Sequence, residues 1–118
     1  MTDTETATDC IFCRIARGEL GTEFVAESPH AVAFRDIAPQ APTHVLIVPR
    51  RHITGLPALT EADAPLVGEM LMLANEVAQR EGLSGGYRVL TNVGPDAGQT
   101  VDHLHFHVLG GRQLGALG

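Results

Sequence analysis

The chain has 118 residues, enough for one folded domain built around a single hydrophobic core. Apolar residues make up 44% of the chain and charged residues 19%, a composition typical of globular proteins and not of disordered ones. The net charge of −6, the absence of lysine and the lack of any long apolar run exclude a protein that holds nucleic acid or a membrane through basic side chains or a membrane span.

The chain divides into a short tail and one domain. Residues 1–9 are polar and acidic and show no apolar periodicity, which predicts a disordered tail. They also lack the basic start and apolar centre of a secretory signal, so we expect a cytoplasmic protein. Residues 10–118 are predicted to form a single domain without an internal linker or repeat.

The first half of this domain is predicted to hold one short helix and three strands. Apolar side chains at helical spacing predict the helix over residues 10–18, with Gly18 at its end. Strands are predicted over residues 24–27 and 31–36, with turn residues between them. An apolar run bounded by prolines predicts a buried strand over residues 45–48.

One long helix is predicted over residues 63–81. Asp63 is placed to cap its start, Pro65 is tolerated in its first turn, and Gly82 is placed to end it. The apolar residues form a stripe wider than a helix on one sheet requires, so the helix is either deeply buried or packed on both its own sheet and a second subunit. The stripe consists of Leu66, Met70, Leu73 and Val77 in one row and Val67, Leu71, Ala74 and Ala78 in the next.

Two further strands are predicted over residues 87–92 and 102–109, joined by a glycine-containing loop at 93–101. Only one connection in the chain is long enough for a helical crossover between parallel strands. Five strands and two helices in this order therefore indicate an α+β fold with a mainly antiparallel sheet.

Three histidines alternate near the end of the chain, at His103, His105 and His107. Alternation along a strand would place the three imidazoles on one face, with Leu104 and Phe106 on the other. A zinc site made by all three is one interpretation, but the outer two lie about 13 Å apart at strand rise. A division of labour between the two ends of the strand is easier, and a simply solvated histidine face is the remaining alternative.

A glycine-rich loop precedes the histidines. Residues 94–100 read Gly-Pro-Asp-Ala-Gly-Gln-Thr, and such a loop can direct backbone N–H groups and a hydroxyl at an anion. The loop lacks the lysine and the strand-to-helix passage of a P-loop. Beside a histidine face, it suggests a phosphate site.

The motif His103-Leu-His105-Phe-His107, followed by apolar residues, resembles the histidine triad (HIT) family. The resemblance covers nearly all of residues 10–118 and extends to the nucleotide-binding Hint branch of that family. It implies a HIT-like α+β fold, with a mainly antiparallel five-stranded sheet, one long helix and one short helix. The other segments that carry the resemblance are residues 37–44, 49–53, 86–88, 92, 98–100 and 109–113.

The resemblance implies a hydrolase of purine nucleoside phosphoramidates with AMP- or GMP-type substrates. His105 would attack the α-phosphorus and carry the nucleotide covalently, as a neutral imidazole near pH 7 is able to do. His107 and His44 would stabilise phosphate charge and assist proton transfer. Thr100 and Gln99 would bind phosphate oxygens, and no catalytic metal is expected.

The same resemblance implies a nucleotide pocket. Asp36 would hold the ribose hydroxyls, Asn92 would support the phosphate loop, and apolar side chains would enclose the base, although core packing alone also explains them. The implied pocket residues are Phe12, Ile15, Phe34, Asp36, Ile37, Leu46, Asn92, Gly98, Gln99, Thr100, His105 and His107. The expected partners are a small-molecule purine nucleotide and a second copy of the chain, in a homodimer formed by the long helix and residues 87–92.

Relatives of other kinds supply the alternatives. His107 stands where related nucleotidyl transferases carry glutamine, which favours hydrolysis, while residues 114–118 lack the tryptophan of many relatives and leave the leaving group open. The alternatives are a nucleotide-binding or scaffold protein with incidental turnover, a dinucleoside polyphosphate hydrolase, and a hydrolase with catalytic zinc on the histidine face.

Cys10 and Cys13 have the spacing of a metal-ligand pair, although no second such pair is present. A thioredoxin-like redox motif would need a preceding strand, and the chain has barely begun. The resemblance to bacterial members that bind zinc implies a closed structural site formed by Cys10, Cys13, His52 and His103. The alternative is a pair of buried, reduced thiols without a metal.

Overall fold

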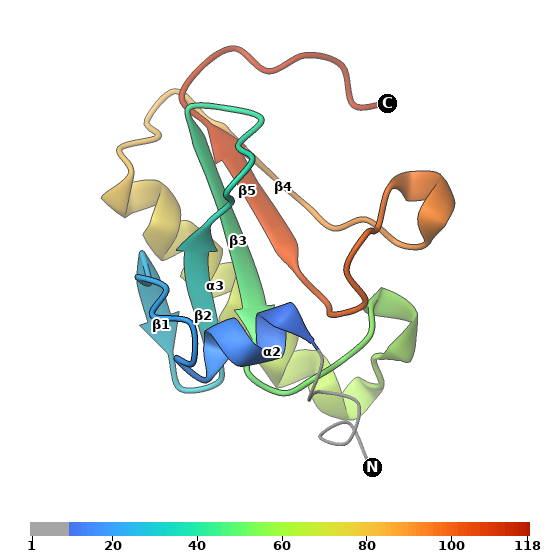
Figure 1. Cartoon of the computed structure of the whole chain (residues 1–118). Helices are drawn as coiled ribbons and strands as arrows, with labels where there is room; N and C mark the ends of the chain where they lie inside the picture. Colours follow the sequence, from blue (N-terminus) through green and yellow to red (C-terminus); the bar gives the residue numbers. More distant parts are fainter. Residues whose placement is uncertain (1–9) are drawn as a thin grey trace.

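The structure is a computed structural model that describes residues 10–118, so the tail predicted at residues 1–9 lies outside the described residues. Five strands form one antiparallel sheet in the order β1-β2-β3-β5-β4, and α3 lies in the long connection between β3 and β4 (Figure 1). The predicted α+β class and five-stranded sheet are confirmed. The strands are β1 Ala26–Ser28, β2 Ala31–Arg35, β3 Thr43–Pro49, β4 Tyr87–Leu90 and β5 Phe106–Gly110.

Two α-helices cover opposite faces of the sheet. The short helix α2 (Ile11–Ala16) lies in front of it in Figure 1 and the long helix α3 (Ala64–Arg80) lies behind. Single-turn 3-10 helices occupy the loops at Leu56–Ala58, Glu61–Asp63 and Pro95–Ala97. Within residues 10–118, no helix combines the length and apolar character needed to cross a bilayer.

Strand alternation divides the core into two clusters. Ile47 and Phe106, which pair directly across β3 and β5, belong to the cluster under α3. Val32 and Leu46 point to the other face, where they pack with Phe12 of α2. The second cluster is small and lies beside the histidines, so the helix that carries Cys10 and Cys13 also roofs that face.

The start of α3 differs from its prediction. Asp63 occupies the N-cap position, but its carboxylate does not cap α3. It accepts from the backbone N–H of Thr60 at 2.9 Å and from the Arg51 guanidinium, and so closes the preceding 3-10 turn. The predicted side-chain cap is wrong because this turn competes for the same carboxylate. The helix ends as predicted, before Gly82 with its positive φ of 68°.

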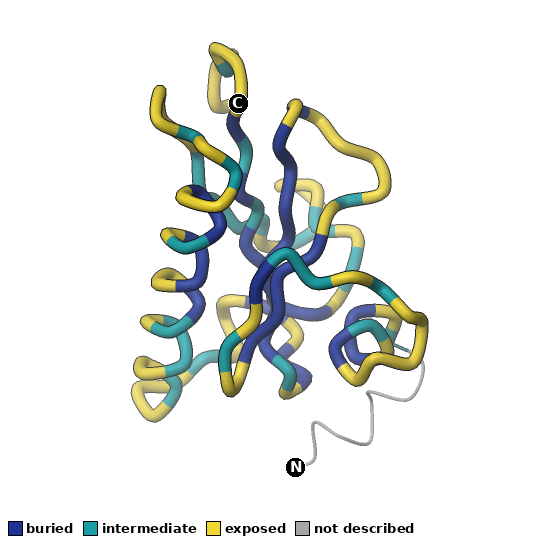
Figure 2. The backbone as a smooth tube through the Cα atoms, turned by 90° about the vertical axis from the view of Figure 1, so that its left-hand side faces the viewer, coloured by how far each residue is buried: buried dark blue, intermediate teal, exposed yellow. Residues whose placement is uncertain are grey.

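The outer face of α3 is not buried within the chain. Leu71 is 47% exposed and the adjacent Met72 is 66% exposed, while Met70 and Leu73 are buried against the sheet. Figure 2 shows the buried positions of α3 turned toward the sheet and the exposed ones turned away. A deeply buried helix is therefore ruled out, and a second subunit on this face remains a proposal.

Only one of the three alternating histidines lies in β5. The strand begins at Phe106, so the prediction of a strand from residue 102 is wrong over its first four residues. The backbone of this stretch bonds outside the ladder: Leu104 donates to the carbonyl of Ile53 at 2.6 Å, and the Thr91 hydroxyl donates to the carbonyl of His105 at 2.7 Å. These bonds bend the chain, which separates His103 from the other two histidines.

Candidate active site and metal centre

The sheet carries two histidines on the face covered by α2. His107 pairs with Leu46 across β5 and β3, and His44 lies two residues before Leu46 on β3, so both imidazoles share its face. His105 enters from the bent segment just before β5. The side chains of His44, His105 and His107 are thus brought together, as the sequence analysis predicted for the catalytic residues.

His105 is held in one tautomer by the backbone. Its Nδ1 lies 2.6 Å from the carbonyl oxygen of His103. A carbonyl oxygen only accepts, so Nδ1 carries the proton and Nε2 keeps a free lone pair. The buried ring packs edge-to-face against Phe12, at 5.1 Å between ring centroids. This is the state in which an imidazole acts as a nucleophile through Nε2.

His44 and His107 form a second histidine pair beside it. His44 Nε2 lies 2.9 Å from His107 Nδ1 and 3.4 Å from a carboxylate oxygen of Asp36. Burial lowers the pKa of His44, against the opposing effect of Asp36. Burial, together with the neighbouring His105 and His44, lowers the pKa of His107 to about 4. Both rings are therefore neutral at pH 7.

Four of the five predicted base-pocket residues gather in one place. Phe12, Phe34 and Leu46 are buried in the small cluster, and Ile15 packs against it. The rings of Phe12 and Phe34 meet edge-to-face at 5.6 Å between centroids. Ile37, in contrast, is fully exposed at 101% and does not belong to this cluster.

The predicted phosphate loop is built by its own side chains. The Gln99 amide oxygen accepts from the backbone N–H of Gly94 at 2.9 Å, and its nitrogen donates to the carbonyls of Thr54 at 2.9 Å and Val101 at 3.1 Å. Asn92 donates to the carbonyl of Ala97 at 2.8 Å, which braces the same loop. The Gln99 side chain therefore shapes the loop, and binding of phosphate by its amide group stays a prediction.

The other two residues of this loop that were predicted to bind the nucleotide, Gly98 and Thr100, are exposed. Gly98 adopts the left-handed conformation, with φ 84° and ψ 22°, at the end of the 3-10 turn. Thr100 is exposed, so its hydroxyl is accessible to a ligand. Glycine suits position 98 because it adopts a positive φ without strain, whereas a residue with a side chain would be strained there.

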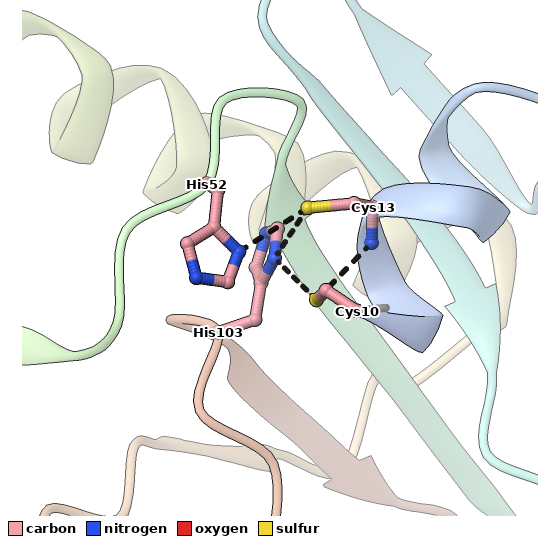
Figure 3. A group of neighbouring side chains, drawn as sticks. All are labelled: Cys10, Cys13, His52 and His103. Carbon is pink, nitrogen blue, oxygen red and sulfur yellow. Dashed lines mark hydrogen bonds between the residues drawn. The ribbon is translucent and has the colours of Figure 1, made fainter. Parts of the chain in front are cut away.

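Cys10, Cys13, His52 and His103 converge at the end of α2. Figure 3 shows the thiols of Cys10, at the N-cap of α2, and Cys13, within α2, facing His52 from the loop after β3 and His103 from the segment before β5. Each residue offers one ligand atom, and these atoms lie within 4.8 Å of one another. Cys10 Sγ is 3.2 Å from His103 Nδ1, and Cys13 Sγ is 3.2 Å from His52 Nδ1 and 3.4 Å from His103 Nδ1. The structure thus brings together all four predicted metal ligands.

The donor set fits a zinc ion. Tetrahedral zinc with Zn–S bonds of about 2.3 Å and Zn–N bonds of about 2.1 Å places sulfur and nitrogen ligands about 3.6 Å apart, close to the distances seen. His103 Nε2 lies 2.9 Å from the carbonyl oxygen of Pro49, so it donates there and leaves Nδ1 free for a metal. Burial raises the pKa of the Cys13 thiol to about 12, so a thiolate at this position requires a cation.

Sequence reasoning missed one contact at the site. The backbone N–H of Gln40 donates to His44 Nδ1 at 3.0 Å. Every residue except proline supplies such an N–H group, so the identity of residue 40 carries no signal for it. Only the path of the loop between β2 and β3 reveals the contact.

Comparison with known proteins gives consistent results. Residues 17–114 match the HIT domain family. An uncharacterized HIT-like protein of Synechococcus elongatus is 46% identical over 106 residues, which cover 90% of this chain and 93% of that protein. The crystal structure of a HIT family hydrolase from Legionella pneumophila is 47% identical with a TM-score of 0.86, covering 89% of this chain and 95% of that one. A HIT family hydrolase from Clostridium thermocellum is 41% identical with a TM-score of 0.89, covering 93% and 96%.

Proposed function

Because this chain belongs to the HIT domain family, we propose that it hydrolyses the P–N bond of purine nucleoside phosphoramidates through a nucleotidyl-histidine intermediate. The observation that carries the proposal is the bond from His105 Nδ1 to the carbonyl of His103, which leaves Nε2 as a nucleophile beside the small apolar cluster that contains Phe12 and Phe34. Similarity to two proteins described as HIT family hydrolases supports hydrolysis in general.

The reaction proceeds in two displacements at phosphorus. In the first, the His105 Nε2 lone pair forms an N–P bond, the P–N bond of the substrate breaks, and its electron pair leaves with the amine, which takes a proton from water. In the second, water attacks the same phosphorus, the N–P bond to His105 breaks, and the electron pair returns to Nε2. The products are an amine and a nucleoside monophosphate, with the water proton released to solvent.

The proposed role of His107 and His44 is to stabilise negative charge on the phosphate in the transition state. The neutral pair lies on the same face as His105, at 5.1 Å between the ring centroids of His105 and His107. N–H groups fixed in this position favour the negative charge that accumulates on the phosphate oxygens in the transition state. Asp36, whose carboxylate lies 3.4 Å from the same His44 Nε2 that faces His107, is the acceptor proposed for the ribose hydroxyls.

Zinc has a structural role in this proposal. Cys10, Cys13, His52 and His103 would hold the ion, which when bound cross-links α2 to the segment before β5. The ligands include the residue whose carbonyl orients His105, so the site supports the nucleophile without contacting phosphate.

A second copy of the chain is proposed to cover the outer face of α3. Leu71, Met72 and Tyr87 are exposed on neighbouring elements, and Tyr87 begins the edge strand β4. Exposed apolar side chains beside a free strand edge favour pairing with another chain. The same pairing is the homodimer expected from the sequence.

The experiment is a comparison of three substrate classes with the full-length protein. Adenosine and guanosine phosphoramidates, dinucleoside polyphosphates and acyl-adenylates are assayed side by side for kcat/KM, with and without a chelator. We expect the phosphoramidates to give the highest kcat/KM. We also expect the chelator to leave activity intact as long as the protein stays folded. Tight AMP binding without turnover of any class would instead identify a nucleotide-binding protein.

A further inference from the structure

The backbone of Gln40 is bonded at both ends. Its N–H donates to His44 Nδ1 at 3.0 Å, and its carbonyl accepts from the Arg112 guanidinium at 2.8 Å. Arg112 lies just after β5, so the segment that follows the histidine strand clamps the loop that contacts His44. Gly111 permits this approach, because a Cβ there would lie 2.9 Å from the Cβ of Pro42.

The bond to Gln40 decides which nitrogen of His44 carries the proton. A backbone N–H only donates, so Nδ1 of His44 must accept and holds no proton. The neutral ring therefore carries its single proton on Nε2. That proton faces His107 Nδ1 at 2.9 Å and the carboxylate of Asp36 at 3.4 Å, the two titratable groups beside the ring.

The tautomer of His44 determines the tautomer of His107. Because His44 Nε2 donates to His107 Nδ1, the neutral His107 ring carries its own proton on Nε2. His105 has the opposite arrangement, with its proton on Nδ1 and a free Nε2. Two histidines two residues apart are thus set in opposite tautomers, one as an electron-pair donor and the other as a hydrogen-bond donor.

Building on the proposed function, we propose that Gln40 is a positioning residue that acts through its backbone N–H. Clamped by Arg112, it holds His44 as an Nε2–H donor, so that His107 presents an N–H and not a lone pair to the phosphate. The side chain of Gln40, which donates to the carbonyl of Ala38 at 3.1 Å, is not required for this.

The same tautomer bears on metal binding. Ligand atoms of Asp36, His44 and His107 lie within 4.8 Å of one another, which makes them a candidate cation site. A cation at His44 Nε2 would displace its proton, while the Gln40 N–H keeps Nδ1 from accepting that proton. The Gln40 contact therefore acts against a cation on the histidine face.

The test uses imidazole ¹⁵N–¹H correlation spectra, which show the tautomer without any substrate. Gln40→Pro removes the N–H, and Gln40→Ala keeps it. We expect His44 to be protonated on Nε2 in the wild type and in Gln40→Ala, and to populate the Nδ1–H form in Gln40→Pro. We also expect kcat of Gln40→Pro to fall at least about fivefold, equivalent to one net hydrogen bond, with KM little changed.

Arg112→Gln supplies a second variant that leaves the loop sequence intact, and Arg80→Gln, which removes an arginine at the far end of α3, is its control. Arg112→Gln should move the His44 tautomer and kcat in the same direction as Gln40→Pro, and Arg80→Gln should move neither. If Gln40→Pro does not fold, Arg112→Gln decides. An unchanged His44 tautomer in the folded variants overturns the inference. Should the wild type hydrolyse no phosphoramidate, the proposed function fails while the spectra still answer the tautomer question.

Discussion

The carbonyl oxygen of His103 lies 2.6 Å from Nδ1 of His105. One residue therefore faces two sites: its ring points to Cys10 and Cys13, and its backbone orients the proposed nucleophile. Phe12 makes the same connection from the other side, since it stands between the two cysteines in the sequence and packs on His105. The proposed metal centre and the proposed nucleotide site therefore share two residues, His103 and Phe12.

The nucleophile is tested most directly by His105→Ala. We expect turnover to fall by roughly 1,000-fold or more, because the covalent step has no substitute, while AMP binding stays measurable. Mass spectrometry of wild-type protein, quenched without acid because acid hydrolyses a nucleotidyl-histidine bond, should find one nucleotidyl adduct, on His105. An adduct on His44 or His107, or substantial turnover in the variant, would contradict the mechanism.

Zinc is tested by Cys13→Ser, with Ile11→Ser as the matched control on the exposed side of α2. We expect wild type and control to purify with one zinc per chain and Cys13→Ser with none. The melting temperature of Cys13→Ser should fall, since a ligand bound only to the native state adds to its stability. Equal melting of all three proteins, none containing zinc, would show that the site does not bind metal.

Because His103 and Phe12 contact both the proposed zinc site and His105, we predict that zinc binding and nucleotide binding are thermodynamically linked. Removing zinc should weaken AMP binding by about tenfold, and by reciprocity AMP should tighten zinc binding by the same factor. Phe12→Leu, which leaves all four ligands in place, should reduce this factor toward one. Calorimetric titration of AMP with and without zinc measures it, and equal AMP affinities in both wild-type states would refute the linkage.

The exposed face of α3 predicts the response of the oligomer. Met72→Glu should yield a folded monomer, because Met72 is exposed within one chain, whereas Met70→Glu should unfold the protein, because Met70 is buried against the sheet. Light scattering at micromolar concentration gives the mass, and circular dichroism reports the fold. A wild type with the mass of one chain would rule out the dimer.

His107 predicts how stability depends on pH. Its pKa is lowered to about 4 in the folded state, against 6.5 as the ordinary value, so between these values the unfolded chain binds more protons. Stability is therefore retained above pH 6.5 and falls as pH drops toward 4, by about 3 kcal/mol from this residue. Urea unfolding at pH 7 and pH 4.5 should show a smaller acid loss in His107→Gln than in the wild type. An identical loss would contradict the assigned burial.

Several parts of the fold follow from local sequence rules. The buried strand around Val45 and Ile47 and the end of α3 before Gly82 were predictable, because apolar runs and positive-φ glycines act over a few residues. The start of β5 was not, because it depends on the bonds of His105 and Leu104 to distant Thr91 and Ile53. Long-range contacts of this kind leave no periodic trace.

The candidate site shows the same division. The grouping of His105 with His107 and of Cys10 with Cys13 was visible from spacing, and their partners His44, His52 and His103 came from resemblance to a known family. The internal bonds of the Gln99 amide were not foreseen, since an amide beside a phosphate loop serves equally well as ligand or brace.

The two parts of the proposed metal centre also lie at nearly opposite ends of the described chain, with Cys10 and His103 separated by 93 positions. An ion joining them closes a loop that contains the whole sheet except its last strand. Because the ion would bind only the native state, its binding free energy would have to offset the chain entropy lost when this loop of about 90 residues closes. During synthesis, His103 is the last of the four ligands to leave the ribosome, long after Cys10 and Cys13. The proposed zinc site would therefore be among the last features of the protein to form.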